Sequence, residues 1–304
     1  MKFGVQHGIG DSRWTPAIIT PTEVKRFAQT AERVGYDAIA FTDHPAPSNR
    51  WVESGGEGVA DLFTSLAFCA AVTERVRLMS FVLMPNYRNP FLMAHAVATL
   101  DHLSAGRVTL GLGTGYLKSE YFALGTDPAF KRADFEEALE VARQVWAGQD
   151  VTYEGRQFSA RGVRAVPASL QTPHPPLYLH GNTDWGLKYA VQHCQGWMGM
   201  LIGPERTNTL KTKPIPDLES MARRIDDVRA ECDRVGRDIA TLEIVVNGNW
   251  GLMDIRKNPS AEQMRDEIGQ LDAMGVTWQC FNICGDDPDA SIETLEWVAD
   301  AVIA

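Results

Sequence analysis

The chain has 304 residues, of which 44% are hydrophobic and 22% are charged, and its formal net charge is −10. This composition is ordinary for a globular enzyme, and the length suits two domains or one α/β barrel of about 250 residues. The acidity argues against nucleic-acid binding, which depends on basic patches. The sequence shows no signal peptide, no membrane-spanning apolar run, and no zinc or redox spacing among its five cysteines. We therefore expect a cytoplasmic protein that binds neither nucleic acid nor membrane.

Apolar strands alternate with amphipathic helices along the chain. The expected strands are 2–7, 38–42, 76–84, 108–112, 177–179, 196–200, 242–246 and 277–281, and the expected helices are 21–34, 60–72, 90–102, 131–147, 185–193, 217–235, 261–273 and 291–301. Such alternation indicates parallel strands with crossover helices. Eight such units predict an α/β fold of the (β/α)8 TIM barrel type, with an open doubly wound sheet as the alternative.

One segment departs from this alternation. Residues 148–176 lack helical periodicity, and 151–158 has the pattern of a hairpin. We therefore predict one barrel domain over residues 1–304, with a small insertion between the fourth helix and the fifth strand.

The second expected strand ends in Thr42, Asp43 and His44, and a loop rich in proline follows. In a barrel of this type, the chemistry takes place where strands end and loops begin. Asp43 and His44 are therefore candidates for an acid–imidazole pair that performs proton chemistry. The alternative is that Asp43 only caps a turn and that His44 is a structural histidine at the rim.

Glycine-rich turns follow the fourth and fifth strands. Gly111-Leu-Gly-Thr-Gly115 lets the backbone approach a ligand closely, but Tyr116 stands where a dinucleotide-binding fingerprint needs glycine, and we reject that fingerprint. The alternative is that a crowded barrel rim needs small residues there. Gly181-Asn-Thr183 leads directly into an expected helix, whose first amides form an anion site. The alternative is that Asn182 or Thr183 only caps the helix, and both can hold because capping leaves further amides free.

Taken together and in this order, four segments resemble the luciferase-like monooxygenase superfamily: Phe41-Thr-Asp-His-Pro45, Tyr87-Arg-Asn-Pro90, Gly111-Leu-Gly-Thr-Gly115 and Gly181-Asn-Thr183. The resemblance covers nearly the whole chain. It implies a barrel that binds flavin or deazaflavin, and a homodimer. The sequence from Thr42 to Ser48 resembles that of the branch that uses the 8-hydroxy-5-deazaflavin coenzyme F-420. FMN is the alternative cofactor.

The resemblance also implies roles for individual residues. Asp43 and His44 would lie near the reactive face of the ring, with His44 as proton donor or acceptor. Phe81 and Val82 match the place where relatives have a non-proline cis peptide under the ring, unless the match is shifted by one residue. The other implied contacts are Gly113, Thr114 and Gly115 against the ring, Gly181, Asn182 and Thr183 at the phosphate, and Trp14, Trp51, Tyr116 and Trp197 as aromatic walls for the cofactor or an apolar substrate.

Two positions leave alternatives open. Arg88 is a candidate for a cofactor carbonyl or phosphate, or else forms a surface salt bridge. Tyr116 stands where the resemblance implies a glutamate in sugar-phosphate dehydrogenases, so we expect that sugar phosphates are not the substrate. The Tyr116 side chain would donate a hydrogen bond to a substrate oxygen or stack.

The leading hypothesis is an oxidoreductase that transfers a hydride between F-420 and a small organic substrate, apolar or aromatic, with His44 supplying the proton. With FMN, the enzyme would instead be a monooxygenase that uses molecular oxygen. A metal-dependent hydrolase with His7, His44 and His180 as ligands is disfavoured, because neither H-x-H nor H-E-x-x-H occurs, and we expect no metal. A non-catalytic flavin binder is the remaining alternative.

Overall fold

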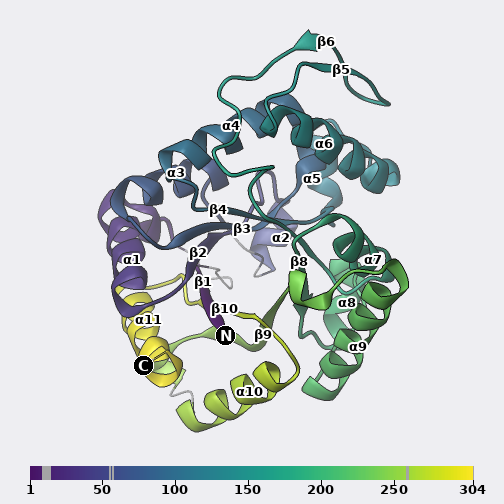
Figure 1. Ribbon diagram of the computed structural model, residues 1–304. Helices are drawn as coiled ribbons and strands as arrows, with labels where there is room; N and C mark the ends of the chain where they lie inside the picture. Colours follow the sequence, from purple (N-terminus) through teal and green to yellow (C-terminus); the bar gives the residue numbers. More distant parts are fainter. Residues whose placement is uncertain (9–14, 55, 57, 258–259, 304) are drawn as a thin grey trace.

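The computed structural model of the chain describes residues 1–8, 15–54, 56, 58–257 and 260–303. Within them, eight parallel strands close into a barrel in the order β1-β10-β9-β8-β7-β4-β3-β2 (Figure 1). The predicted TIM barrel is confirmed, and the open sheet is wrong. The barrel strands are β1 (Lys2–Gln6), β2 (Ala38–Phe41), β3 (Arg77–Leu83), β4 (Val108–Leu112), β7 (Leu177–His180), β8 (Gly196–Met200), β9 (Glu243–Met253) and β10 (Trp278–Ile283).

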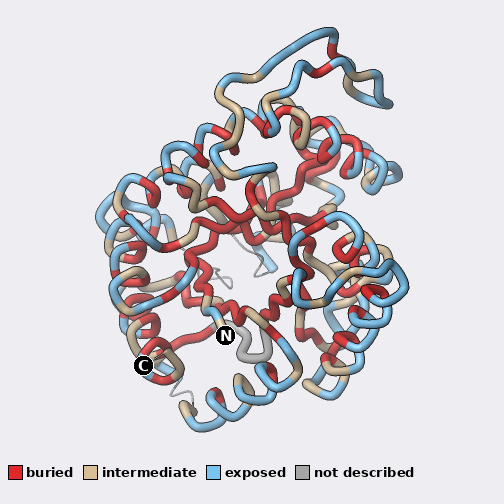
Figure 2. The backbone as a smooth tube through the Cα atoms, viewed as in Figure 1, coloured by how far each residue is buried: buried red, intermediate tan, exposed pale blue. Residues whose placement is uncertain are grey.

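Eight longer helices surround the barrel, each within a few residues of its predicted range. In α1, the Thr20 hydroxyl accepts a hydrogen bond from the Glu23 amide, and Gly35 ends the helix in the left-handed conformation. Figure 2 shows the strands buried and the helices exposed on their outer faces. The helices are α1 (Pro21–Val34), α3 (Leu62–Val72), α4 (Pro90–Leu103), α6 (Lys131–Trp146), α7 (Asp184–His193), α9 (Leu218–Val235), α10 (Ala261–Ala273) and α11 (Pro288–Val302).

Three short helices that the sequence pattern did not predict follow the carboxyl ends of barrel strands. They are α2 (Asn49–Glu53) after β2, α5 (Lys118–Ala123) after β4, and α8 (Pro204–Leu210) after β8. Single 3-10 turns occupy Pro16–Ile19, Pro85–Tyr87, Pro128–Phe130, Ile239–Thr241 and Ile255–Lys257. The structure therefore adds helices at the end of the barrel where chemistry takes place in this fold.

The predicted insertion contains a hairpin, but this hairpin extends to Val163, beyond the predicted residues 151–158. Strands β5 (Val151–Glu154) and β6 (Ser159–Val163) pair antiparallel and stand outside the ring, at the top of Figure 1. None of the described helices is long and apolar enough to cross a membrane.

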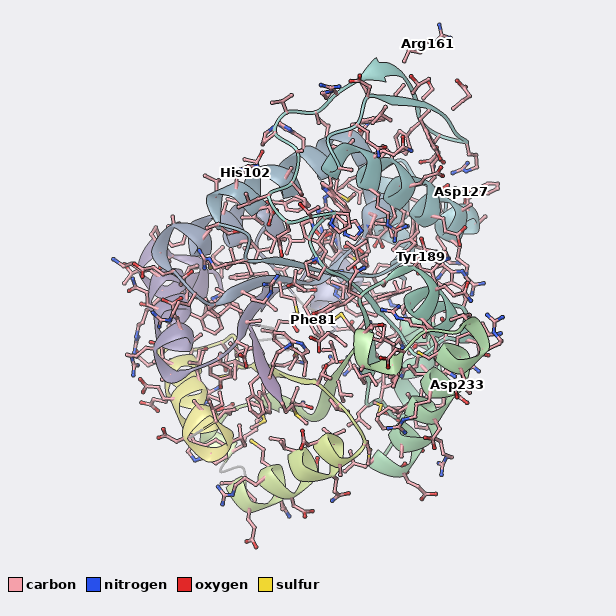
Figure 3. The ribbon with its side chains drawn as sticks, viewed as in Figure 1. Phe81, His102, Asp127, Arg161, Tyr189 and Asp233 are labelled. Carbon is pink, nitrogen blue, oxygen red and sulfur yellow. The ribbon has the colours of Figure 1, made fainter. Side chains whose placement is uncertain are left out.

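The inside of the barrel is filled by an apolar cluster. Its members come from alternate positions of the strands and are buried: Ala38, Ala40, Met79, Phe81, Tyr178, Met198, Val245, Trp278 and Cys280. Phe81 lies near the middle of the ring in Figure 3. Because this cluster fills the interior, a ligand can enter only from the strand ends above it.

Arg107 ties the opposite, amino-terminal end of the barrel together. Its guanidinium donates hydrogen bonds of 2.8–3.0 Å to the carbonyl oxygens of Ala70, Thr73, Val76 and Ser104 and to the Thr73 hydroxyl. These acceptors belong to the end of α3, the start of β3 and the turn after α4, so one side chain joins three units.

Replacing Arg107 by methionine should destabilise the protein, because several carbonyl oxygens would lose a charged donor at once. We expect the midpoint of thermal unfolding to fall by roughly 5 °C or more. The control is Arg161→Met on the exposed β5–β6 hairpin (Figure 3), which should unfold with the wild type. Equal midpoints for the Arg107 variant and the wild type would contradict this role.

Candidate active site

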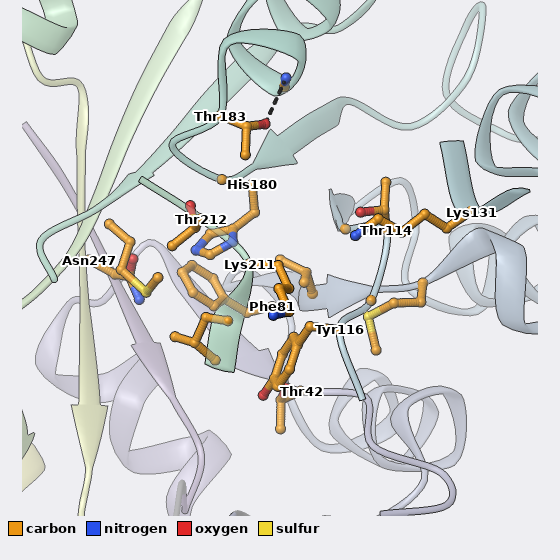
Figure 4. A pocket seen from close by; sticks show the side chains of 18 of the residues that line it. Thr42, Phe81, Thr114, Tyr116, Lys131, His180, Thr183, Lys211, Thr212 and Asn247 are labelled. Atoms are coloured by element: carbon orange, nitrogen blue, oxygen red, sulfur yellow. Dashed lines mark hydrogen bonds between the residues drawn. The ribbon is translucent and has the colours of Figure 1, made fainter. Parts of the chain in front are cut away.

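A pocket opens at the carboxyl ends of the barrel strands (Figure 4). Strand ends supply one part of its lining, and the starts of α6 and α7 together with the segment around α8 supply the rest. The lining residues are Gln6, Thr42, His44, Phe81, Val82, Met84, Gly113, Thr114, Gly115, Tyr116, Lys131, Arg132, His180, Gly181, Thr183, Trp185, Gly186, Met200, Arg206, Leu210, Lys211, Thr212, Asn247 and Asn282.

His44 is buried at the edge of this pocket. Its Nδ1 atom lies 3.1 Å from the Oε1 atom of Glu120, and its Nε2 atom lies 3.4 Å from the hydroxyl of Tyr116. Trp51 on α2 lies beside the two rings, with centroid distances of 6.0 Å to His44 and 5.7 Å to Tyr116. The imidazole therefore stands between a carboxylate and a phenol, and Nε2 is the nitrogen on the side of the pocket-lining Tyr116.

The structure does not form the predicted pair of Asp43 with His44. The Asp43 carboxylate instead receives two hydrogen bonds of 2.5 Å from the guanidinium of Arg88, and a longer one of 3.4 Å from the Met84 amide. Neither Asp43 nor Arg88 lines the pocket. Arg88 therefore lies outside the described pocket, and its ion pair with Asp43 is half-buried rather than on the surface. It holds the end of β2 against the loop after β3.

The ends of β3 and β4 bring Phe81, Val82 and the glycine turn to the pocket. The Phe81–Val82 peptide is cis, in the register that the resemblance implied. Gln6 donates a 3.1 Å hydrogen bond to the Phe81 carbonyl. Gly113 permits the close approach of the two strand ends, because a side chain there would lie 2.9 Å from Val82.

Gly115 has a positive φ of 76° and lies directly against Tyr87. A β-carbon at this position would lie 2.2 Å from the Tyr87 hydroxyl. Thr114 between these glycines is fixed through its carbonyl, which accepts hydrogen bonds from Asn86 and Tyr121. Both glycines are therefore sterically required, and the turn lines the pocket as well.

Polar groups on other strand ends face the same pocket. The Asn247 Oδ1, Asn282 Oδ1 and His180 Nε2 atoms are buried and have no hydrogen-bond partner among the described residues. Burial lowers the pKa of His180 to about 4. The imidazole is therefore neutral at pH 7, and this part of the pocket offers uncharged hydrogen-bonding groups to a ligand.

The turn before α7 contributes differently from the prediction. The Asn182 side chain points away from the pocket and bonds to the backbone of Met200 and Lys213, while its amide donates to the Thr212 hydroxyl at 3.0 Å. Thr183 caps the helix by accepting from the Gly186 amide at 3.1 Å (Figure 4). Gly181 and Thr183 line the pocket, whereas Asn182 is structural and does not offer its amide to an anion.

Four basic residues form a cationic rim around the pocket: Lys131 and Arg132 at the start of α6, and Arg206 and Lys211 in and after α8. None of the four forms an ion pair within the described part of the chain. Burial lowers the pKa of Lys131, and the nearby charges of Arg132 and Lys211 lower it further. Like charges gathered without a partner are unfavourable, so the rim fits an anionic ligand.

The predicted aromatic walls are mostly absent from the described pocket. Trp197 is fully buried, donates from its indole nitrogen to the Gly181 carbonyl at 3.0 Å, and supports the turn from behind. Trp51 lies behind His44 rather than on the lining, and Trp14 lies outside the described residues. Of the four predicted residues, Tyr116 lines the pocket, and Trp185 is a lining residue that the sequence reasoning missed.

Sequence reasoning also missed Glu120, the cationic rim and the unpartnered side-chain oxygen of Asn247. A signal existed for the rim: Lys131 and Arg132 stand in the first turn of a helix, where the helix dipole disfavours positive charge. Two adjacent basic residues at that position suggest a function other than helix stability. Glu120 gave no such signal, because it stands in a helix too short to show periodicity.

The histidines of the metal-hydrolase hypothesis do not gather at one point. His7 packs against the rings of Phe27 and Phe41 and does not line the pocket. Among the described residues, no group of three or more histidine, cysteine, aspartate or glutamate side chains is arranged to hold a metal ion.

Comparison with known proteins now adds to the geometry. Residues 1–250 match the family of luciferase-like monooxygenases. The chain belongs to this family. It is 39% identical over 295 residues to a protein of Beutenbergia cavernae named F420-dependent glucose-6-phosphate dehydrogenase, covering 90% of this chain and 83% of that protein. This member of the luciferase-like monooxygenase family is an enzyme of the oxidoreductase class.

Solved structures agree on the fold. The monooxygenase RslO1 from Streptomyces bottropensis superposes with a TM-score of 0.80 at 23% identity, over 100% of this chain and 99% of that one. An F420-dependent secondary alcohol dehydrogenase, solved with an F420–acetone adduct, superposes with a TM-score of 0.74 at 18% identity, over 99% of this chain and 98% of that one. At these identities, the likeness shows that the luciferase-like barrel is shared.

The ion pair between Asp43 and Arg88 should stabilise the folded protein. Asp43→Asn leaves a half-buried guanidinium without its carboxylate and should cost about 3 kcal/mol of unfolding free energy. The double variant Asp43→Asn with Arg88→Met removes both charges and should recover part of this loss. Urea unfolding of the wild type, both single variants and the double variant measures the coupling. Strictly additive effects would show that the two side chains do not act together.

Proposed function

We propose that the protein is a deazaflavin-dependent oxidoreductase, which transfers a hydride between coenzyme F-420 and a small organic substrate. The observation that carries this proposal is the cationic rim, in which Lys131, Arg132, Arg206 and Lys211 face the same pocket as His44 without an ion-pair partner in the described chain. F-420 carries carboxylates in addition to its phosphate, whereas FMN carries one phosphate. Several gathered cations therefore favour F-420 over FMN. The names of relatives that use F420 support the same choice.

The pocket fits a planar ring with an anionic tail. The unpartnered Asn247, Asn282 and His180 atoms suit the polar edge of a ring. Phe81, Val82 and the Gly113–Gly115 turn would lie against its face. Thr183 caps α7 and leaves earlier amides at the helix start, which together with the rim would hold the phosphate.

The role of the chain's own residues follows from this placement. When bound, the deazaflavin donates or accepts the hydride at a carbon of the substrate. His44 supplies the accompanying proton from Nε2 to a substrate atom next to that carbon, or removes it in the reverse direction. Tyr116, 3.4 Å from Nε2, donates a hydrogen bond to the same substrate atom and keeps it within reach.

The substrate part of the proposal is less restrictive than the sequence suggested. The apolar or aromatic substrate rested on four aromatic walls, and only Tyr116 of those residues lines the described pocket. The substrate panel should therefore include unsaturated and aromatic compounds, secondary alcohols, and glucose 6-phosphate, which the name of the Beutenbergia relative specifies. The phenol of Tyr116 still disfavours the sugar phosphate.

Cofactor titration tests the proposal directly. We expect quenching of the protein's tryptophan fluorescence to saturate with F-420 at lower concentration than with FMN. Lys211→Glu and Arg206→Glu should each weaken F-420 binding by about tenfold or more, and added salt should reduce the difference. Lys25→Glu on the outer face of α1 is the control and should bind as the wild type does. Tighter binding of FMN would favour the monooxygenase, and no binding of either would contradict the proposed function.

Loss of the His44 imidazole should slow turnover without weakening cofactor binding. Once the panel has identified a substrate, His44→Ala should reduce turnover by about 100-fold or more, because the proton donor is lost. The affinity for F-420 should change little, since the rim and the α7 turn remain. Stopped-flow absorbance of the cofactor measures turnover, and fluorescence titration measures binding. Turnover equal to that of the wild type would exclude His44 as the proton-transfer residue.

A further inference from the structure

We propose that Glu120 is the positioning residue of this site, and that its buried carboxylate fixes the tautomer and the charge of His44. This inference deepens the proposed function, because it concerns the same imidazole. It is nevertheless testable without any cofactor, since it concerns two side chains of the protein itself.

The geometry of Glu120 is that of a carboxylate built to face a histidine. Its side chain is 1% exposed, and that of His44 is 6% exposed. The Oε1 atom lies 3.1 Å from His44 Nδ1, and the Oε2 atom accepts a 3.2 Å hydrogen bond from the Tyr87 hydroxyl. Both carboxylate oxygens are therefore occupied, one by the imidazole and the other by a phenol.

Tyr87 is a neutral hydrogen-bond donor to the Glu120 carboxylate. Burial raises the pKa of Tyr87, and the Glu120 carboxylate raises it further. The phenol therefore stays protonated and acts as the donor to Oε2. Its place beneath Gly115 requires the absence of a side chain there, since a β-carbon would lie 2.2 Å from the Tyr87 hydroxyl. Gly115 thus makes room for the Tyr87 hydroxyl, which in turn holds the Glu120 carboxylate.

The charge of Glu120 points to His44. A carboxylate removed from water is unfavourable unless a cation or several donors compensate it. In the described part of the chain, the ion-pair partner within reach of Glu120 is His44, and no lysine or arginine pairs with it. A negative charge next to Nδ1 favours a proton on that nitrogen.

A proton fixed on Nδ1 leaves Nε2 as the nitrogen of His44 that exchanges a proton with the substrate. With Nδ1 protonated and held by Glu120, Nε2 on the Tyr116 side is the atom that gains or loses the second proton. A hydride that reaches the substrate carbon is then matched by one proton from Nε2, and the reverse reaction returns both. Without Glu120, either nitrogen of the neutral ring could hold the proton.

Three other titratable groups of the described residues lie near His44: Tyr116, Tyr87 and Asp43. Tyr116 faces Nε2 from the loop after β4, and Tyr87 lies behind Glu120. Asp43 precedes His44 in the chain, but its carboxylate is taken up by Arg88. Among the described residues, Glu120 is therefore the carboxylate whose removal changes the charge in contact with the imidazole.

Nitrogen-15 NMR of the protein without cofactor tests the inference. The chain has seven histidines, and the ring signals that disappear in His44→Gln are those of His44. In the wild type, we expect the neutral ring to carry its proton on Nδ1. Glu120→Gln keeps the size of the side chain and removes its charge, so the titration midpoint of His44 should fall by about one to two pH units.

Kinetics of the loaded enzyme give a second readout. In Glu120→Gln, the limb of the kcat profile that reports His44 should move to lower pH by the same amount, while KM stays nearly constant. The matched control is Glu137→Gln, because Glu137 is also buried but accepts from the amides of Gln157 and Phe158, away from the pocket. It should leave the His44 midpoint unchanged.

The outcomes separate this inference from the proposed function. An unchanged midpoint in Glu120→Gln, or a wild-type neutral ring protonated on Nε2, overturns the role of Glu120 even if F-420 binds tightly. The wild-type spectrum decides the question even if the variant does not fold. A shifted midpoint in a protein that binds no deazaflavin would uphold the role of Glu120 and leave the cofactor assignment as the part that failed.

Discussion

The site depends on one constraint, the closure of a parallel barrel around an apolar interior. Met79, Tyr178, Met198 and Trp278 fill the ring, so the polar residues that follow the strands can reach water or a ligand on one side only. Because all strands run in the same direction, residues as distant in the chain as Gln6 and Asn282 meet at the same rim. The chemistry is thus local in space and spread over the whole sequence.

This constraint also explains which parts of the fold were predictable. Barrel strands and outer helices each bury one face, so apolar residues recur in their sequences with the period of a strand or a helix. The predicted bounds match the structure to the residue for Pro21–Val34, Val108–Leu112, Gly196–Met200 and Ala261–Ala273. The helices α2, α5 and α8 are each shorter than two turns, so their sequences cannot show the 3.6-residue period of a helix. They were missed, and they carry or adjoin much of the site.

The site residues divide in the same way. Phe81, Val82 and the Gly113–Gly115 turn were predicted because a motif fixes their place relative to a strand end, and they line the pocket. Residue type alone misled at Trp197 and Arg88, because an indole or a guanidinium serves equally well as a buried structural donor. Asp43 and His44 are adjacent in sequence but bond to different partners, Arg88 and Glu120.

The cationic rim of the pocket and the buried Glu120 carboxylate lie on different elements, and this separation would orient an anionic ligand. The cationic rim stands on α6 and on the segment around α8, whereas the Glu120 carboxylate stands on α5 behind His44. The proposed anionic tail would be attracted to the rim and repelled from the side of Glu120, because charges in a partly buried site are weakly screened. The uncharged end of such a ligand is thereby directed toward His44 and Tyr116. The same acidic residue that holds the imidazole in one tautomer thus also helps to decide which end of the ligand reaches it.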